Sequence, residues 1–320
     1  MALKDNYSIN LLDILENIEL NDKEKIENAK NLIMLTEREK TKKRNNQKKG
    51  LELHTLNERA KDEFKTLIRT ALGEYCQLSY NILKINIESQ YKTRFLYLTS
   101  YTEDDNKVYY GAVKKYSNRK GVVTMEELKK EKNRLATVKD LQEIWGLEER
   151  ETRKTVKALK DSGLIRIEED KTITLNKNVV RKYNNDNFNI KDTTRVFNEG
   201  LREIYSKATP KEHKRLFLLF ELLPYVNINH NVLCTVETTN KKEIEEIRAL
   251  KFSNLADTLG YKNKARFKKD LLNIKVGGRP VISLVENCNG KFLYINPKVY
   301  YRGSNIEDLR GLCNIFEIKH

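Results

Sequence analysis

The sequence has few residues that form covalent or metal cross-links. It contains four cysteines in 320 residues, and Cys76, Cys234, Cys288 and Cys313 lie far apart. None of them belongs to a C-x-x-C pair, so the spacing predicts neither a zinc site nor a disulfide framework. We therefore expect ordinary thiols, no bound metal and no cofactor.

Long apolar segments are missing as well. No stretch reaches the roughly 18 apolar residues that a membrane span needs. The N-terminus also lacks the pattern of a signal peptide. We therefore expect a cytoplasmic protein that makes no contact with a membrane.

Sequence motifs of catalysis are also absent. The chain has no G-x-x-x-x-G-K-[ST] phosphate loop and no His-hydrophobe-His metal site. Tyr300 and Tyr301 could serve a tyrosine recombinase, but none of the four histidines is followed by an arginine three residues later, as such an enzyme would need. We therefore expect that the protein is not an enzyme.

Acidic residues are outnumbered by basic ones. Lys plus Arg number 61 and Asp plus Glu number 46, which gives a formal net charge of +15. This excess indicates a polyanionic partner, unless the lysines only raise solubility. Abundant Lys, Asn and Ile are typical of an AT-rich genome, which raises the lysine count without a functional cause. The local pattern of charge is therefore more informative than the net charge.

The stretch 251–303 is the most informative part of the sequence. Two short helical patterns meet at Gly260, where glycine permits a sharp turn, and they predict a helix-turn-helix at 253–275 with Ser253 as the helix cap. The apolar period then changes to two at 280–296, which predicts a β-hairpin. This order of elements predicts a helix-turn-helix with a wing.

The second helix of this motif is strongly basic and contains one acid, Asp270. Such a helix suits the phosphate-lined major groove of DNA. The alternative is a solvated helix face on a lysine-rich protein. The residues expected to bind DNA here are Lys262, Asn263, Lys264, Arg266, Lys268, Lys269, Lys275 and, on the wing, Lys291.

A second motif of the same kind lies earlier in the chain. Two helical patterns at 137–161 meet at Gly146, and an alternating stretch at 164–176 predicts a wing. Glu148 and Glu149 open the second helix and would repel phosphate, so we expect the C-terminal motif to do the main base reading. This motif is expected to make weaker DNA contacts or a protein contact. Its expected DNA-binding residues are Arg150, Arg153, Lys154 and Lys157.

The two motifs lie within longer stretches that also match. Asn176 aligns with Asn296 at an offset of 120, and the apolar sequence that begins at Arg94 resembles the one that begins at Arg215, at an offset of 121. We interpret the match as an internal duplication. The alternative is chance, because apolar helices commonly look alike.

These patterns predict five parts of the chain. Residues 1–37 form amphipathic helices, of which 8–35 are expected to bind a second copy of the chain or a replication or transcription protein. A basic linker at 38–49 follows, as an arm along DNA or as a solvated tether. The remaining parts are a helical region with the first winged helix at 50–183, a linking helix with the second winged helix at 184–303, and a tail helix at 304–320.

The expected fold class is mainly α with small β wings (α+β), as two tandem winged-helix domains preceded by an N-terminal helical region. Additional helices are expected at 54–91, 192–207, 210–223 and 241–250. At 91–101 and 108–113 the pattern does not separate helix from strand.

Residues 209–303 begin with a Thr-Pro-x-Glu helix start and close with INPKVYYRG, which contains Asn296, Pro297 and Gly303. In these features the segment resembles the winged-helix module of RepL-type plasmid replication proteins and their phage relatives. The resemblance covers less than a third of the chain and implies a DNA-binding module. Two winged helices in tandem are also similar in architecture to iteron-binding plasmid initiators, whose two modules bind successive groove faces of one repeat.

The expected function is therefore sequence-specific binding of double-stranded DNA, as a replication initiator of plasmid or phage type that binds origin repeats. A phage or plasmid transcriptional regulator is the alternative, because the same features fit both roles. A recombinase-like enzyme is a third and disfavoured reading. Either DNA-binding role would place the protein on the nucleoid or on the DNA of a mobile element.

Overall fold

The computed structural model describes residues 37, 40–43, 59, 62–111, 134–182, 193–287 and 290–318. The chain divides into two compact units, Met1–Glu63 and Phe64–His320. We call the second unit the body. Its described residues form a mixture of helices and strands. None of the helices in the described ranges is long and apolar enough to cross a membrane.

Little of the first unit is described. Residues 40–43 are helical and exposed, whereas the sequence favoured an irregular linker at 38–49. Thr41 Oγ1 donates to the carbonyl oxygen of Glu37 at 2.8 Å, which is the spacing of a helical turn. Of the amphipathic helices expected at 1–37 only Glu37 is described. The segment 8–35, which was expected to bind a partner, lies outside the described residues, as does the remainder of the linker.

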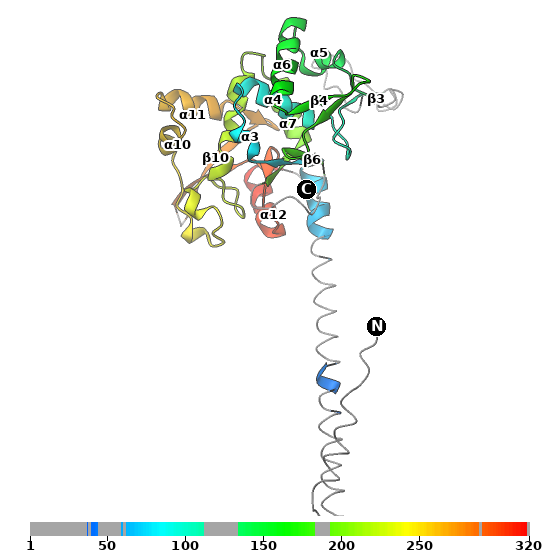
Figure 1. Cartoon of the computed structure of the whole chain (residues 1–320). Coiled ribbons are helices and arrows are strands. Elements are labelled where there is room, and N and C mark those ends of the chain that lie inside the picture. The colour runs from blue at the N-terminus through cyan, green and yellow to red at the C-terminus, as the bar shows by residue number, and fades with distance from the viewer. Residues whose placement is uncertain are drawn as a thin grey trace, which may run out of the picture. The chain divides into compact units, whose positions relative to one another are not determined.

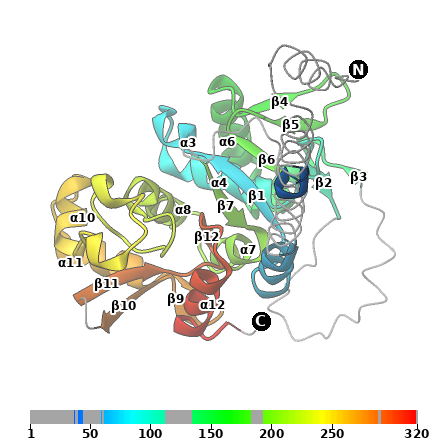
Figure 2. The ribbon, with the colours of Figure 1, turned by 90° about the horizontal axis from the view of Figure 1, so that it is seen from below.

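Four short strands form the central sheet of the body. They are β1 (Tyr75–Ser79), β6 (Val180–Lys182), β7 (Thr193–Phe197) and β12 (Tyr300–Tyr301). The strand order is β12-β7-β1-β6, and every neighbouring pair is antiparallel. Figure 2 shows β1 and β7 in the middle of this sheet with β6 and β12 outside them.

The first half of the body runs from β1 to β6. Between these strands it contains α3 (Asn81–Lys84), α4 (Ser89–Thr99), β2 (Tyr109–Tyr110), β3 (Arg134–Leu135), α5 (Asp140–Trp145), α6 (Glu149–Asp161), β4 (Ile165–Ile167) and β5 (Ile173–Leu175). Strands β4 and β5 form an antiparallel hairpin directly after α6. Gly146 turns the chain between α5 and α6 in the left-handed region, with φ of 62°, which is a conformation that glycine adopts at little cost.

The second half runs from β7 to β12 and has the same order of main elements. Its helices are α7 (Asn198–Ser206), α8 (His213–Leu216), α9 (Leu218–Glu221), α10 (Phe252–Thr258) and α11 (Lys264–Leu272), with 3-10 turns at Leu223–Tyr225, Val236–Thr238 and Ile244–Glu246. Its other strands are β8 (Lys275–Val276), β9 (Arg279–Pro280), β10 (Ile282–Asn287) and β11 (Gly290–Ile295), and α12 (Ile306–Ile315) follows the sheet. Strands β10 and β11 form the hairpin after α11.

Matching hydrogen bonds occur in the two halves. Asn106 and Asn231 both have positive φ, of 61° and 53°. The carbonyl oxygen of Asn106 accepts from Leu175 N–H and that of Asn231 accepts from Ile295 N–H, each at 2.9 Å. Their side-chain amides donate to the first residue of β6 at 2.7 Å and to the first residue of β12 at 3.1 Å. Both halves therefore tie their hairpin to the central sheet in the same way.

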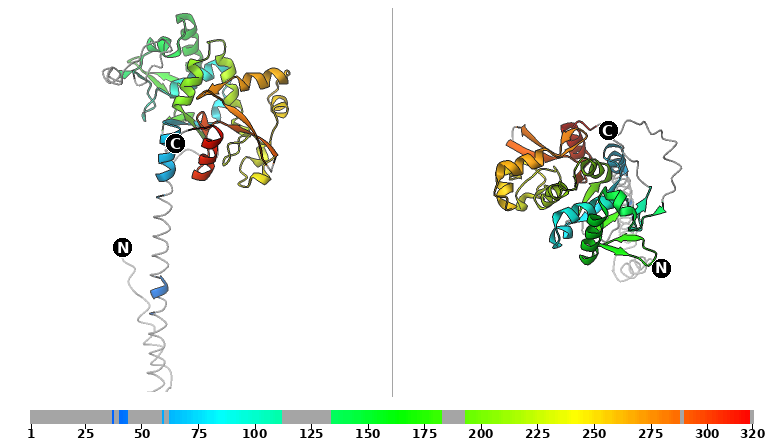
Figure 3. Two further views of the ribbon diagram at one scale, coloured as in Figure 1. Left: turned by 180° about the vertical axis from the view of Figure 1, so that it is seen from behind. Right: turned by 90° about the horizontal axis from the view of Figure 1, so that it is seen from above.

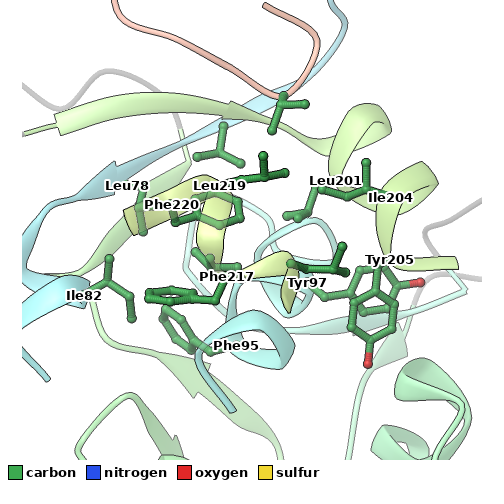
Figure 4. Close-up of a cluster of buried hydrophobic side chains, with 14 of the residues drawn as sticks. Leu78, Ile82, Phe95, Tyr97, Leu201, Ile204, Tyr205, Phe217, Leu219 and Phe220 are labelled. Carbon is green, nitrogen blue, oxygen red and sulfur yellow. The ribbon is translucent and has the colours of Figure 1, made fainter. Parts of the chain in front are cut away.

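The sheet separates two apolar clusters. Alternate strand residues point to opposite faces, so Leu78 and Val196 belong to the larger cluster and Phe197 and Tyr301 to the smaller. The larger cluster contains the packed helices α4 and α8. Figure 4 shows its side chains, including two aromatic rings that stack near its edge. The smaller cluster holds helical residues 64–71 and α12 against the sheet.

Two expected helices are partly strands in the structure. Residues 75–79 were expected to continue a helix but form β1, and 193–197 were expected to begin the linking helix but form β7. Both segments pair with another strand on each side. Because these pairings join distant parts of the sequence, tertiary context overrides the local period. The segments expected at 50–183 and 184–303 thus share one sheet. The body is a mixture of helices and strands, and its strands are not confined to the two hairpins.

Two other helix predictions need correction. The charged helix expected at 241–250 is reduced to the 3-10 turn Ile244–Glu246, and of its apolar residues only Ile247 is buried, which leaves little burial to stabilise a helix. The helix expected at 210–223 is interrupted at Phe217 and begins at His213. Thr209 N–H and Oγ1 donate to the Glu212 carboxylate at 2.9 and 2.8 Å, but α8 is capped by Glu212 without a side-chain hydrogen bond, so only part of the expected capping box forms.

Candidate nucleic-acid interface

Helix α6 presents a basic stripe on its exposed side. Its buried residues are Thr152, Thr155, Val156 and Leu159. The residues Arg150, Lys154 and Lys157 recur at i, i+4 and i+7 and are exposed, so they lie on the opposite side of the helix. None of these three cations has an ion pair with a residue that the structure describes. The stripe is therefore available to an anionic partner.

The acids at the start of α6 are mostly engaged within the protein. Glu149 forms an ion pair with Arg153, and Glu151 Oε1 lies 2.8 Å from Nη1 of Arg94. Glu148 remains exposed at the helix start. The repulsion of phosphate expected from these carboxylates is thus partly offset, and the contrast between the two motifs is weaker than the sequence predicts.

Helix α11 buries Phe267 and Leu271, which contributes about 1.5–3 kcal/mol of stability for each side chain. Ala265 and Lys269 are exposed and lie on the opposite side. Asn263, a predicted DNA contact, is the helix cap, and its Oδ1 accepts from the backbone N–H of Arg266 at 2.9 Å. Its structural role is therefore to satisfy the free N–H groups of the first turn.

Three predicted DNA-binding cations of the α11 region have partners inside the protein. Lys264 Nζ lies 2.6 Å from Asp257, and Arg266 Nε lies 3.8 Å from Asp270. Lys268 Nζ lies 5.7 Å from the centre of the Phe252 ring.

The other cations of this region have no such partner. Lys262, Lys269 and Lys275 are exposed and make no ion pair within the described ranges. Lys262 precedes the helix and Lys275 follows it on β8. The cations available to a ligand thus lie at both ends of α11 and on its outer face.

The two hairpins differ in charge. On β10–β11, exposed Lys291 lies 3.1 Å from Glu286, and the hairpin tip at 288–289 is outside the described residues. On β4–β5, hydrogen bonds from Thr174 and then Arg166 lower the pKa of Glu168. That acid stays ionised at neutral pH and pairs with Arg166, and exposed Glu169 and Asp170 follow it. The first hairpin therefore carries more negative charge near its tip than the described part of the second.

A matching ion pair anchors each basic helix. Arg94 on α4 donates to Glu151 at 2.8 Å and to Thr155 at 2.7 Å on α6. Arg215 on α8 donates to Asp270 on α11 at 3.2 Å. The sequence alignment matched Arg94 with Arg215 but did not indicate that either arginine holds a basic helix, because the partner acids are distant in sequence.

A buried polar cluster connects the two halves. Arg94 Nε donates to Nδ1 of His213 at 3.4 Å. The imidazole stacks on Tyr205 with ring centres 4.2 Å apart, and Tyr205 stacks on Tyr97 at 3.7 Å. Burial, and then the charge of Arg94, lower the pKa of His213 to about 4. Figure 4 shows the stacked pair of Tyr97 and Tyr205. The sequence did not identify this cluster.

The basic faces of α6 and α11 belong to the same body. Figures 1 and 3 show the two helices at separate outer edges, and Figure 2 shows α4 and α8 between them. The described residues contain no group of three potential metal ligands. Burial raises the pKa of the Cys76 thiol to about 11, so this thiol is neither a reactive nucleophile nor a ready metal ligand.

No protein-family model matches the chain, and comparisons with curated proteins and with solved structures also found no match.

Proposed function

We propose that the protein binds double-stranded DNA sequence-specifically through two winged-helix modules. In this proposal α5 and α6 with the β4–β5 hairpin form one module, and α10 and α11 with the β10–β11 hairpin form the other. Helices α6 and α11 enter the major groove, because their outer faces carry cations while their inner faces are buried in the body. The observation that carries the proposal is this repeated placement of a basic helix face.

The hydrogen bonds that match between the halves also support this proposal. A repeat of this kind places two reading helices on one rigid support, which is suited to a DNA site longer than one module could contact. The ion pairs Arg94–Glu151 and Arg215–Asp270 hold the helices from behind. The outward cations are therefore presented by fixed elements, as base reading requires.

The role that we favour is initiation of replication on a plasmid or phage origin, and transcriptional regulation is the alternative. Both need the same DNA contacts. They differ in the arrangement of sites: an initiator binds several repeats beside an AT-rich tract, whereas a regulator binds at a promoter. Mapping the binding sites on the DNA that carries the gene distinguishes the two roles.

A recombinase-like enzyme remains disfavoured. Tyr300 and Tyr301 are 1% and 0% exposed, and the Tyr300 hydroxyl donates to the carbonyl oxygen of Leu219 at 3.0 Å. Burial raises the pKa of Tyr300 far above its ordinary value. Neither hydroxyl is available to attack a DNA phosphate in this conformation.

The test compares three double variants that each remove two positive charges. The variants are Lys154→Gln with Lys157→Gln on α6, Lys262→Gln with Lys269→Gln at α11, and Arg279→Gln with Arg310→Gln as the matched control. Binding to labelled duplex DNA is measured by fluorescence anisotropy over a range of salt concentrations. Log K falls as log[salt] rises, and each lost phosphate contact reduces the steepness of this fall by about 0.9.

We expect the two helix variants to bind DNA more weakly, with a salt dependence less steep by up to about 1.8, and the control to bind like the unchanged protein. The control removes exposed cations that pair with Glu317 and Glu307, so it tests whether net charge alone matters. Equal loss in all three variants would show that the chain binds DNA only through its overall charge.

A further inference from the structure

The central sheet has the symmetry of an approximate twofold axis. Strands β1 and β7 are antiparallel, and Gln77 pairs with Arg195 at their centre. Gln77 also pairs with Arg181 on β6, and Arg195 pairs with Tyr301 on β12. Rotation by half a turn about the Gln77–Arg195 pair therefore exchanges β1 with β7 and β6 with β12.

The sequence offsets agree with this rotation. It places Arg195 on Gln77, an offset of 118, and Tyr301 on Arg181, an offset of 120. The alignment of Asn176 with Asn296 gives the same offset of 120. The rotation thus exchanges Arg181 and Tyr301 at the offset of the repeat, and Gln77 and Arg195 at an offset that differs from it by two residues.

The elements beside the sheet follow the same rotation. Helix α4 packs on α8, which are the helices that carry the equivalent residues Arg94 and Arg215. Each arginine reaches the basic helix of its own half, at 2.8 Å to Glu151 and 3.2 Å to Asp270. Figure 2 shows α6 and α11 on opposite sides of the paired α4 and α8. The axis that relates the halves therefore also relates the two helices.

This symmetry restricts how two helices can lie on one duplex. If a twofold axis relates two helices that enter grooves of the same duplex, the axis must run perpendicular to the DNA and coincide with one of its own dyads. The two helices then read the strands with opposite polarity, as do the recognition helices of a symmetric dimer on its operator. Two modules joined head to tail would read them with the same polarity.

We propose that a single chain recognises two half-sites in inverted orientation, one read by α6 and the other by α11. This inference rests on the proposed function. The half-sites differ in sequence, because the outer faces of the helices differ: Arg150, Lys154 and Lys157 stand on α6, whereas Ala265 and Lys269 stand on α11. The site is therefore not a palindrome. Its two half-sites are inverted, but the DNA sequence contains no inverted repeat that would reveal this.

The test maps both ends of both helices on bound DNA. The duplex is one recovered by the full chain from a random-sequence pool. An iron chelate that cleaves DNA is attached to a single cysteine in four variants: Glu149→Cys and Asp161→Cys at the ends of α6, and Lys264→Cys and Asn273→Cys at the ends of α11. Cys288 is replaced by serine in all four, and the other three cysteines are each 0% exposed.

The cleavage centres define two spans, one between the starts of the helices and one between their ends. Inverted half-sites give two spans of different length with a common centre, and the reagents at the starts of α6 and α11 favour opposite strands. Head-to-tail half-sites give spans of equal length that are displaced along the DNA, with the same strand favoured, and this result overturns the proposal. Localised cleavage from one helix alone also overturns it.

If the unmodified chain binds no duplex in the anisotropy assay, the proposed function itself fails, which is a separate result.

Discussion

Arg94 is a cation that the fold places almost entirely out of water. Its side chain is 2% exposed and contacts Glu151, Thr155 and His213. A buried cation is stable only when its hydrogen bonds and its charge are satisfied. Its partners come from both halves of the body, so Arg94 helps to fix the position of α6 relative to α8.

We predict that Arg94→Met destabilises the body by about 2–3 kcal/mol. The loss is smaller than the roughly 3–5 kcal/mol typical of a broken buried ion pair, because Glu151 is 34% exposed and regains some hydration. The matched control is Arg153→Met, whose ion pair with Glu149 is exposed on both sides and should change stability by less than about 0.5 kcal/mol. Urea unfolding followed by circular dichroism measures both, and equal effects would rule out a special role for Arg94.

His213 should make the stability of the body depend on pH. Its pKa is about 4 in the folded protein, below the ordinary value of 6.5. The unfolded chain therefore binds the proton at higher pH than the folded protein does. The contribution of His213 to stability is complete above pH 6.5. It is lost as the pH falls towards 4, by a total of about 3 kcal/mol.

The variant His213→Gln has no group that titrates at this position. We predict that its unfolding free energy changes less between pH 6.5 and 4 than that of the unchanged protein. The raised pKa values of Glu221 and Asp308 act in the opposite direction, but they are common to both proteins and cancel in the difference. Parallel pH profiles for the two proteins would contradict the assignment.

At the scale of elements, α11 combines cations with and without internal partners. Lys264 lies 2.6 Å from Asp257, whereas Lys269 has no ion pair with a described residue and lies opposite the buried face. A phosphate contact by Lys264 would have to compete with Asp257. We predict that Lys269→Gln weakens duplex binding more than Lys264→Gln does, and that it makes the salt dependence less steep by about 0.9. Anisotropy titrations at several salt concentrations compare the two losses of affinity. A larger loss in Lys264→Gln would show that the phosphate contact lies at the start of the helix.

The helices and hairpins of the proposed interface could be predicted because local signals define them. Gly146 and Gly260 mark sharp turns, and both have positive φ, of 62° and 74°. The exposure of the predicted DNA-binding cations on α6 and α11 agrees with helical periodicity in the same way. These features depend on residues close together in the chain, so a single sequence is enough to indicate them.

The central sheet could not be predicted for the opposite reason. Tyr75 pairs with Phe197 and Gln77 with Arg181, and β12 is only two residues long. Such strands have little local pattern, and their stability comes from partners more than a hundred residues away. The ion pair of Arg94 with Glu151 was missed for a related cause, because it depends on how α4 lies against α6.

At the scale of the whole molecule, the shared sheet makes the two halves depend on each other. Strand β7 pairs with all five residues of β1, and α8 packs on α4. We predict that a fragment of residues 184–320 does not fold cooperatively, because it loses both partners and exposes the larger apolar cluster. Thermal unfolding of the fragment and of the full chain, followed by circular dichroism, tests this. A cooperative transition in the fragment would show that the second half is an independent domain.

The shared sheet also fixes the distance between α6 and α11. This distance should determine the spacing of the two half-sites in the DNA. Two helices on one face of a duplex read half-sites about one helical turn apart, roughly 10 base pairs. An insertion of about five base pairs between the half-sites turns one of them to the far side of the duplex. We predict that binding then falls to the level of a duplex with a single half-site.

An insertion of a full turn distinguishes a rigid body from two tethered modules. It returns both half-sites to the same side of the duplex but separates them by about 34 Å more. Tethered modules could follow the second half-site and recover much of the affinity. Modules that share a sheet cannot, so we predict no recovery with the longer insertion. Binding titrations on the parent duplex, the two insertion duplexes and a single half-site duplex test this, and recovery with the full turn would mean that the central sheet opens when the protein binds DNA.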